Sequence, residues 1–375
     1  MQMIRCLFVL SDLESGGAQR VLLTVLKQLD RAAFEPHLAV ADTTGPLYKE
    51  LPGNAAIHFL GSSRVRYLLP ALHRLVRKVR PRVVVSTLGH LNLALLASKG
   101  LFPKGTRLVV REANTPSARL AQTSHPTLYR WGFRTLYPRA DRVLCNAAFM
   151  KEDLVNGFSV AREKAAVVPN PVDTGRILGR VEGAENPYPK GGEGPQIVSV
   201  GRLTHQKGYD LLAKVMKEAT VRFPSLHLTI VGDGPEKEAL EGLSTELGLG
   251  EKVTFAGHRD NPYPFMAHAD LFISSSRYEG SPNAVLESLA CGTPVLAFDC
   301  PGGTREIISE GKNGWLVPAE EVGAMAAKLV DLIRSRAWET MASKRLLPKA
   351  FECRNAVRAY ESVLLKCARG EDSGL

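Results

Sequence analysis

Long apolar runs are missing from this chain of 375 residues. Its longest apolar stretches, such as residues 91–97, are far shorter than the ~18–20 residues that a membrane-spanning helix needs. The apolar part of residues 1–12 is too short for a secretory signal peptide and lacks a small-residue cleavage site, so it predicts a buried first strand instead. We therefore expect a cytoplasmic protein with no membrane-inserted segment.

Cysteine is also scarce, and the six residues are scattered over positions 6, 145, 291, 300, 353 and 367. They form no C-x-x-C pair and show no histidine partner pattern, which argues against a zinc site and against a disulfide framework. This usage fits a reducing compartment such as the cytoplasm. No Lys-Ser or Lys-Thr pair follows the glycines near residue 16, which excludes a Walker-type phosphate loop.

Acidic residues are few in the first half of the chain. Residues 1–170 contain 24 basic and 11 acidic side chains, a net charge of +13, whereas residues 171–375 contain 24 and 27, a net charge of −3. Between residues 51 and 140, Glu112 is the only acid among 15 Lys and Arg residues. Such a surplus attracts an anionic membrane surface or nucleic acid, unless it only keeps the protein soluble. No zinc finger, recognition helix or aromatic RNA platform accompanies the surplus, so we expect no nucleic-acid binding.

Two basic segments of the first half have amphipathic patterns. Over residues 66–80, a period of 100° per residue places leucine and valine side chains on one face and the basic residues, with His73, on the other. Residues 125–139 interleave aromatic and basic side chains, a composition typical of membrane interfaces. Core packing with a solvated charged face is the alternative for both segments. As residues that contact the acceptor or the membrane we predict Arg66, Arg74, Arg77, Lys78, Arg80, Arg111, Arg130, Trp131 and Arg134.

Short apolar runs alternate with longer amphipathic stretches, which predicts parallel sheets with helices on both faces. Residues 180–195 interrupt this alternation with Gly, Pro and charge, a composition typical of a linker. We therefore predict an α/β fold with two Rossmann-like, doubly wound domains over residues 1–175 and 196–352, joined by residues 176–195. A last helix at about 353–375 can return to the first domain.

Two loops at the carboxyl ends of predicted strands carry candidate residues for an anion, because open α/β sheets bind ligands there. Gly16 and Gly17 open a helix after the first strand, so their backbone amides can meet a phosphate. Arg202 and Lys207 follow Gly201 after the first strand of the second domain, and such a cation pair suits a diphosphate. The alternatives are a tight turn for the glycines and solvated surface charges for the cations.

A third loop contains Glu279 and Glu287, eight residues apart around a Ser-Pro-Asn segment that predicts a helix start. The amides of Asn283, Ala284 and Val285 then precede the helical hydrogen bonds and can face an anion. Glu287 lies about one turn inside this helix, where a carboxylate can accept two hydroxyls of a ribose. A favourable interaction of the glutamates with the helix dipole is the alternative explanation.

Together these motifs make the sequence similar to retaining glycosyltransferases of family 4, which have the two-domain GT-B fold. The resemblance covers nearly the whole chain and is densest in the second half. It rests on GGAQR at 16–20, VPNPVD at 168–173, VGRLTHQKG at 200–208, IVGDGP at 230–235, VTFAGH at 253–258, YEGSPNAVLESLACGTPV at 278–295 and EIISEGKNGWLVP at 306–318. It implies two Rossmann-like domains that face a central cleft.

The resemblance also implies roles for matching positions. The implied catalytic residues are Glu279 at the transferred sugar, Arg202 and Lys207 at the donor diphosphate, and His90 near the donor sugar. The implied substrate-binding residues are Gly16, Gly17, Asn283, Ala284 and Val285 near the phosphates, Glu287 at the ribose, His258 and Arg259 at the base, and Gly201 and Asn170. A structural role is the alternative for both histidines.

Two further segments, S-x-L-x-H-x-N at 86–92 and VREANTP at 110–116, resemble bacterial members that extend polyprenyl-diphosphate oligosaccharides. The expected function is retaining transfer of an N-acetylhexosamine or hexose from a UDP-sugar to such a lipid-linked acceptor, at the cytoplasmic face of the inner membrane. No D-x-D motif occurs, and we expect no metal or other cofactor. A soluble-acceptor or phosphatidylinositol-type transferase and a UDP-GlcNAc epimerase of the same fold stay open as alternatives.

Overall fold

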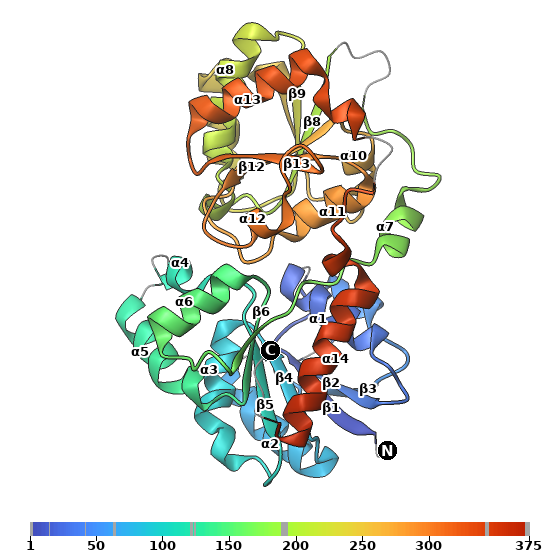
Figure 1. Ribbon diagram of the computed structural model, residues 1–375, viewed down its shortest axis with the longest axis vertical. Coiled ribbons are helices and arrows are strands. Elements are labelled where there is room, and N and C mark those ends of the chain that lie inside the picture. The colour runs from blue at the N-terminus through green and yellow to red at the C-terminus, as the bar shows by residue number, and fades with distance from the viewer. Residues whose placement is uncertain are drawn as a thin grey trace. The chain divides into compact units, whose positions relative to one another are not determined.

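The computed structural model describes residues 3–14, 16–41, 43–62, 65–120, 123, 125–188, 194–341 and 345–371. The chain forms two compact units. Unit 1 contains Met1–Pro171 together with Cys353–Leu375, and unit 2 contains Val172–Glu352. Each unit is layered around its own parallel sheet (Figure 1).

Within the described residues, unit 1 has a sheet of seven strands in the order β3-β2-β1-β4-β5-β6-β7. The strands are β1 (Ile4–Leu10), β2 (Phe34–Val40), β3 (Ala56–Phe59), β4 (Val83–Thr87), β5 (Arg107–Arg111), β6 (Arg142–Cys145) and β7 (Ala165–Val167). The middle strands are buried on both faces, which explains their nearly continuous apolar sequence. The strand order reverses between β1 and β4, and open α/β sheets bind ligands outside the carboxyl ends of the strands at such a point.

Helices cover both faces of this sheet (Figure 1). They and the short 3-10 turns are α1 (Gly17–Gln28), η1 (Pro46–Glu50), α2 (Val65–Val79), α3 (Gly89–Ser98), η2 (Lys99–Leu101), α4 (Pro116–Leu120), α5 (Pro126–Leu136), η3 (Tyr137–Arg139), α6 (Ala148–Phe158) and α14 (Cys353–Arg369). One apolar cluster joins α2, α3, α5 and α6 to one face, and another joins α1 and α14 to the other. These two clusters are the core of unit 1.

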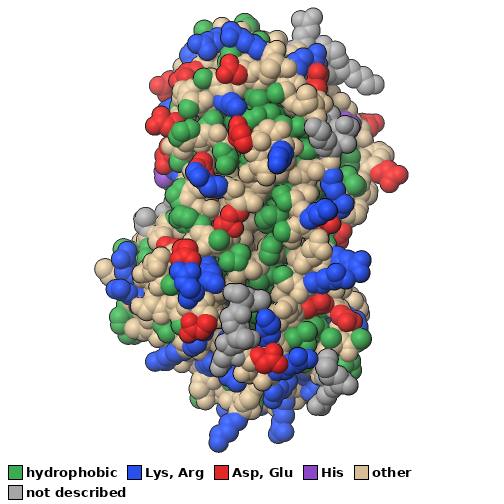
Figure 2. All heavy atoms as spheres, viewed as in Figure 1, with side chains coloured by type: hydrophobic (Ala, Val, Ile, Leu, Met, Phe, Trp, Pro, Cys, Tyr) green, Lys and Arg blue, Asp and Glu red, His purple; other side chains and the backbone are tan. Residues whose placement is uncertain are grey.

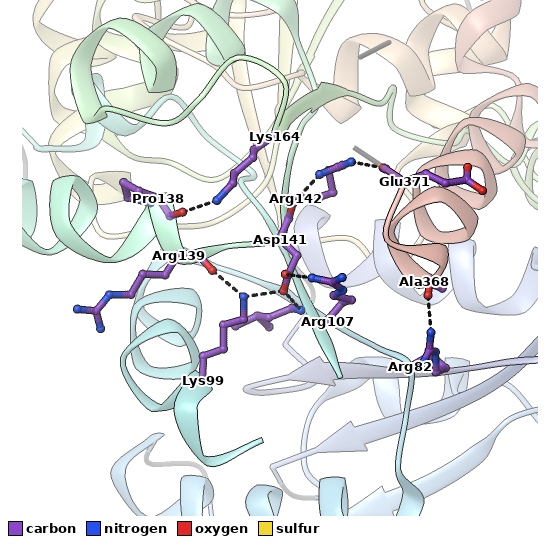
Figure 3. A network of polar contacts seen from close by, with 11 residues as sticks. Arg82, Lys99, Arg107, Pro138, Arg139, Asp141, Arg142, Lys164, Ala368 and Glu371 are labelled. Carbon is purple, nitrogen blue, oxygen red and sulfur yellow. Dashed lines mark hydrogen bonds and ion pairs between the residues drawn. The ribbon is translucent and has the colours of Figure 1, made fainter. Parts of the chain in front are cut away.

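Helix α14 is far along the chain from the rest of unit 1, yet it packs beside α1. Two arginines of unit 1 hold the last turn of α14 and the residues directly after it (Figure 3). Arg82 Nη2 donates to the carbonyl of Ala368 (2.8 Å), and Arg142 Nη2 donates to the carbonyl of Glu371 (2.6 Å). Because the last carbonyls of a helix have no intrahelical donor, cationic donors suit them.

The same network continues around Asp141, directly before β6 (Figure 3). Its carboxylate forms ion pairs with Lys99 (2.7 Å) and Arg107 (3.1 Å). Lys164 Nζ donates nearby to the carbonyl of Pro138 (2.7 Å). Some of the basic side chains of unit 1 therefore form contacts within its own structure.

Unit 2 has, within the described residues, six parallel strands in the order β10-β9-β8-β11-β12-β13 around one apolar cluster. The strands are β8 (Gln196–Val200), β9 (His227–Val231), β10 (Val253–Gly257), β11 (Leu271–Ser274), β12 (Val295–Asp299) and β13 (Gly314–Pro318). The helices and 3-10 turns are α7 (Thr174–Val181), η4 (His205–Lys207), α8 (Tyr209–Arg222), α9 (Lys237–Glu246), η5 (Gly250–Lys252), α10 (Tyr263–Ala267), α11 (Asn283–Cys291), α12 (Thr304–Ile307), α13 (Val322–Ser335), η6 (Ala337–Thr340) and η7 (Lys349–Phe351).

The two parallel α/β sheets confirm the predicted fold class, but the connection between them differs from the expected linker. Residues 176–195 include most of α7, whose N-cap Asp173 accepts a hydrogen bond from the amide of Arg176. Ile177 of this helix is buried in the core of unit 2. The predicted boundary at residue 175 thus falls inside a helix of unit 2. No helix among the described residues is long and apolar enough to cross a membrane.

Candidate active site

Lys207 and Glu279 meet at the carboxyl edge of the unit 2 sheet. Lys207 ends η4 after β8, and Glu279 lies in the loop between β11 and α11. The Lys207 Nζ lies 2.6 Å from Glu279 Oε1, and the Ser276 hydroxyl donates to the same oxygen at 2.7 Å. The Glu279 side chain is only 7% exposed, so two donors fix a carboxylate that is nearly removed from water.

Backbone contacts fix the loop that carries Lys207. Gly208 has a φ of +64°, and a Cβ there would lie 2.1 Å from the carbonyl oxygen of Ser275, so only glycine fits. The Ser275 hydroxyl donates to the carbonyl of Lys207 (2.9 Å), and the amide of Arg277 donates to the carbonyl of Gln206 (2.8 Å). The β8 and β11 loops are thereby joined, which holds the Lys207 ammonium beside Glu279.

Helix α11 begins beside this pair. The first intrahelical hydrogen bond runs from the Leu286 amide to the carbonyl of Pro282 (3.2 Å), so the amides of Asn283, Ala284 and Val285 precede the helical ladder, as predicted. Pro282 is the N-cap residue, so the helix starts within the Ser-Pro-Asn segment as predicted.

A small pocket opens at this place. It is lined by Ser199, Val200, Lys207, Tyr209, Phe272, Ser274, Ser275, Ser276, Glu279, Pro282, Ala284 and Val285. Gly201 lies against it, because a Cβ there would be 3.4 Å from Cε of Lys207. A cation, a carboxylate and a helix start around one pocket can bind and polarise an anionic, hydroxyl-bearing ligand.

Glu287 is half-buried on α11 and has a partner that the sequence did not reveal. The hydroxyl of Tyr263, which is 1% exposed, lies 3.4 Å from Glu287 Oε1 and 3.4 Å from Nη1 of Arg176 in α7. Tyr263 and Ser276 carry no motif of their own; only the place of Ser276 in the serine run before Glu279 could have suggested a role.

Three predicted residues of unit 2 stay at the surface. The Arg202 side chain is exposed and forms no hydrogen bond or ion pair within the described part of the chain, while its carbonyl accepts a hydrogen bond from the Thr204 hydroxyl (3.5 Å). His258 and Arg259 are exposed after β10, where His258 lies 3.4 Å from the Asp260 carboxylate. These three side chains are accessible to a ligand. None of them forms a hydrogen bond with Lys207 or Glu279.

The glycine loop of unit 1 is organised by a side-chain contact. Gln19 Nε2 donates to Asp12 Oδ1 (2.6 Å), and a Cβ on Gly16 would lie 2.3 Å from Gln19 Oε1. Any larger residue at position 16 would displace the Gln19 side chain from this contact, while Gly17 is exposed at the start of α1. His90 is the second residue of α3 at the same edge of the sheet, and its side chain reaches solvent.

Arg111 and Asn170 have positions that change their interpretation. Arg111 is 1% exposed, so it cannot face a membrane, and Asn170 is 2% exposed. Arg111 Nη2 donates to Asn170 Oδ1 (2.7 Å), Nε to the hydroxyl of Tyr360 in α14 (2.9 Å), and Nη1 to that of Thr87 (3.2 Å). These residues join the ends of β4, β5 and α14 and act as internal structure.

The remaining predicted contact residues lie on exposed helix faces. Arg74, Arg77, Lys78 and Arg80 are exposed along and after α2, and Arg130, Trp131 and Arg134 are exposed on α5. The Arg66 side chain lies outside the described residues. His73 is not on the charged face as predicted, since it is 8% exposed and packs on Phe102. Figure 2 shows Lys and Arg side chains gathered at the lower end of unit 1.

No group of three or more His, Cys, Asp and Glu side chains within the described residues is arranged to hold a metal ion. The fold and the unit 2 cluster instead define a GT-B glycosyltransferase. The structure of Anabaena HepE with UDP and glucose superposes with a TM-score of 0.78 at 19% identity, covering 97% of this chain and 100% of HepE. Sucrose-phosphate synthase of Thermosynechococcus elongatus gives 0.79 at 17%, covering 98% of this chain and 100% of that one.

The chain belongs to glycosyltransferase family 4. Residues 15–176 match Glycosyltransferase Family 4, and residues 182–345 match Glycosyl transferases group 1. The chain is 32% identical, over 96% of its length and 95% of the relative, to an N-acetylgalactosamine-N,N'-diacetylbacillosaminyl-diphospho-undecaprenol 4-alpha-N-acetylgalactosaminyltransferase of Campylobacter jejuni. It is 28% identical, over 88% and 90%, to the lipopolysaccharide core biosynthesis glycosyltransferase LpsE of Rhizobium meliloti.

Proposed function

We propose that this glycosyltransferase moves an N-acetylhexosamine or a hexose from a UDP-sugar to a lipid-linked saccharide on a polyprenyl diphosphate, with retention of configuration. The observation that carries the proposal is the Lys207–Glu279 pair at the pocket beside the start of α11. The acceptor class is supported by the C. jejuni relative, which acts on a diphospho-undecaprenol-linked saccharide. The donor class is supported by HepE, whose structures contain UDP and UDP-glucose.

In this proposal Arg202, Lys207 and the first amides of α11 bind the donor diphosphate. Negative charge develops on the leaving UDP, and fixed donors in a water-poor site stabilise such charge. Positive side chains and amides then supply the stabilisation that Mg²⁺ supplies in other transferases. Glu279, whose one oxygen is fixed by Lys207 and Ser276, contacts hydroxyls of the transferred sugar, and Glu287 binds the ribose.

Retention requires that the acceptor attack the face that UDP leaves. The bond between the anomeric carbon and the donor phosphate oxygen breaks, the bond to the acceptor hydroxyl oxygen forms, and the acceptor proton passes to the departing phosphate. No side chain is needed as a covalent nucleophile in this scheme. His90 lies near the donor sugar in the same scheme and orients it.

Unit 1 attaches the enzyme to the anionic cytoplasmic face of a membrane. The support is chemical: α2 and α5 expose cations, and α5 also exposes Leu128 (63%) and Trp131 (62%). Arg and Lys near an anionic leaflet contribute about 1 kcal/mol each, and tryptophan rings favour the headgroup depth.

The test is a panel of UDP-, GDP- and ADP-sugars incubated with the full chain, with and without a polyprenyl-diphosphate-linked saccharide, and analysed by mass spectrometry. We expect a UDP-sugar to be consumed only with the acceptor, with unchanged rate after EDTA, and with the donor's anomeric configuration in the product by NMR. Conversion of UDP-GlcNAc without acceptor would show an epimerase. Transfer to phosphatidylinositol or to soluble sugars alone would overturn the acceptor class.

A further inference from the structure

Arg277 follows Ser276 in the loop between β11 and α11 and is not among the predicted site residues. Its side chain is only 13% exposed. The two terminal nitrogens donate to the two carboxylate oxygens of Asp210, Nη1 at 2.8 Å and Nη2 at 2.7 Å, and Nη1 also donates to the carbonyl of His205 at 2.9 Å. A planar guanidinium that binds a carboxylate through both nitrogens fixes the direction of its partner as well as the distance.

The two partners of the Arg277 side chain lie on either side of Lys207. His205 is the first residue of η4, which ends at Lys207, and Asp210 lies in the first turn of α8. One side chain therefore holds the main chain at the start of η4 and at the start of α8. The backbone that carries the Lys207 ammonium lies between these two contacts.

The loop that carries Glu279 is held from the opposite direction. Gln206 Nε2 donates to the carbonyl of Tyr278 (3.1 Å), and the Arg277 amide donates to the carbonyl of Gln206 (2.8 Å). The residue before Lys207 is thus bonded to the two residues before Glu279. These contacts join the two segments whose side chains meet at 2.6 Å.

The two acidic partners of Arg277 differ in their surroundings. The hydrogen bonds between Arg277 and Asp210 lower the pKa of Asp210 and raise that of Arg277, so this pair stays charged around neutral pH. Glu320, between β13 and α13, lies 3.3 Å from Nε of Arg277 and is 53% exposed. An ion pair with such an exposed partner contributes little. Asp210 is therefore the acid through which Arg277 acts on the Lys207 segment.

The position of the Lys207 ammonium depends on the backbone beneath it. A lysine side chain is a flexible four-carbon stem with a charged end, unlike the planar fork of an arginine. If η4 shifts, the Nζ atom moves away from Glu279. A misplacement of about 1 Å in a reacting site can lower the rate by about a hundredfold.

From this arrangement we propose that Arg277 is a positioning residue of the donor site, which holds the Lys207 ammonium beside Glu279 through Asp210 and the carbonyl of His205. The inference rests on the proposed function for the role of Lys207 at the donor diphosphate. In this proposal Arg277 acts through Lys207 and leaves the contact with the phosphates to it.

The first experiment measures binding of UDP and of uridine, which lacks the phosphates, to the full chain by calorimetry. We expect Arg277→Met and Asp210→Asn each to weaken UDP about tenfold and uridine less than about twofold, since one charged contact to phosphate is lost. Arg277→Lys keeps the charge without the fork and is expected to be intermediate. The matched control is Glu320→Gln, which removes the exposed partner of the same arginine and is expected to change neither affinity.

A double-mutant cycle separates positioning from a general structural role. In the transfer assay we expect Arg277→Met to lower kcat/KM about 10–100-fold in the wild-type background and less than about twofold in the Lys207→Ala background, where no ammonium is left to position. Equal losses in the two backgrounds would overturn the proposal, as would equal weakening of UDP and uridine. Asp210→Asn is the smaller change and gives the same comparison if Arg277→Met does not fold.

The geometry itself can be tested without a nucleotide. In a crystal structure of the Arg277→Met or Asp210→Asn variant, we expect the distance between Lys207 Nζ and Glu279 Oε1 to grow by about 1 Å or more. An unchanged distance in both variants would contradict the positioning role. If the wild type does not bind UDP but the variants separate Lys207 from Glu279, the proposed donor is wrong and the positioning role of Arg277 stands.

Discussion

Unit 2 brings two candidate site charges, Lys207 and Glu279, together, whereas many of the more numerous cations of unit 1 are bound in its own structure. In unit 2 a single lysine and a single buried glutamate meet at a pocket beside a helix start. In unit 1 many cations have structural partners. Arg82 and Arg142 hold α14 and the residues after it, and Lys99 and Arg107 hold Asp141 (Figure 3). Arg111 joins β5 to Tyr360 and Asn170.

The difference teaches that net charge does not count the side chains that are available to a partner. The one acid between residues 51 and 140, Glu112, is buried, so it does not offset the exposed cations. The exposed cations are concentrated on α2 and α5, where they alternate with apolar side chains rather than with acids. Four predictions test this difference between structural and available charges.

The largest effect is expected in unit 2. Glu279→Gln keeps the side-chain shape but removes the charge that pairs with Lys207, and Lys207→Ala removes the cation; each is expected to lower kcat/KM by about 10²–10³-fold, the usual size for one preorganised electrostatic contact. Lys214→Ala, on the exposed face of α8, is the matched control. Near-normal turnover of both site variants, with wild-type circular dichroism, would contradict the assignment.

In unit 1 we expect a large effect on stability. Arg111→Met leaves Asn170, Thr87 and the Tyr360 hydroxyl without their buried donor, and we expect the free energy of unfolding to fall by about 3 kcal/mol. Arg74→Met on the exposed face of α2 is expected to change it by less than about 0.5 kcal/mol. Urea unfolding of both variants measures the contrast, and equal effects would remove the distinction between internal and surface arginines.

The third prediction compares how much the exposed cations of each unit contribute to membrane binding. Arg74, Arg77 and Lys78 replaced together by Ala are expected to weaken binding to anionic vesicles about a hundredfold at low salt, since each cation contributes about 1 kcal/mol. Added salt is expected to weaken wild-type binding in the same way. The control removes three exposed cations from α8 of unit 2, Lys214, Lys217 and Arg222. Equal losses in the two triple variants would show attraction by net charge alone.

The smallest effect is expected from acidification. Burial and the neighbouring Arg77 charge hold the pKa of His73 below its usual value. Both ring nitrogens are buried without a partner in the described residues, so the folded state favours the neutral ring. The neutral His73 ring contributes fully to the free energy of unfolding above the pKa of an unfolded histidine, about 6.5. Below that pH the contribution falls by at most about 1.4 kcal/mol per pH unit. Urea unfolding at pH 7.5 and 5.5 measures this loss of stability, and His73→Leu is expected to make the loss smaller. If the variant loses as much stability as the wild type, groups other than His73 are responsible.

Most of the architecture could be predicted because the central strands are apolar on both faces and the helices between them are amphipathic. The strands β3, β7 and β13 have no clear signal in the sequence. β3 is a partly exposed edge strand and β7 has three residues, so neither carries a clear period. β13 reads Gly-Trp-Leu-Val-Pro and is flanked by turn residues that mask it. Helix α7 was missed because Gly and charge near residues 179–187 suggest a linker.

The candidate site shows the same limit. Lys207, Glu279 and the start of α11 could be predicted, since each follows directly from a local motif at a strand end. Ser276 and Tyr263 could not, because their roles depend on which segment lies opposite them in the fold. Arg111 was misplaced for the same reason: a sequence shows that an arginine is present in a basic region, but only the fold shows that Tyr360 and Asn170 close over it.

Helix α14 also has a consequence for the order in which the protein can fold. Tyr360 and the last carbonyls of α14 complete the core and the polar contacts of unit 1, yet the ribosome makes them after the whole of unit 2. Unit 2 is continuous in sequence and can fold as it emerges. Until α14 is available, only α1 covers its part of that face of the unit 1 sheet, and the place of α14 stays open. Unit 2, with the Lys207–Glu279 pair, can thus form first, and the basic unit 1 reaches its final form only after α14 has been made.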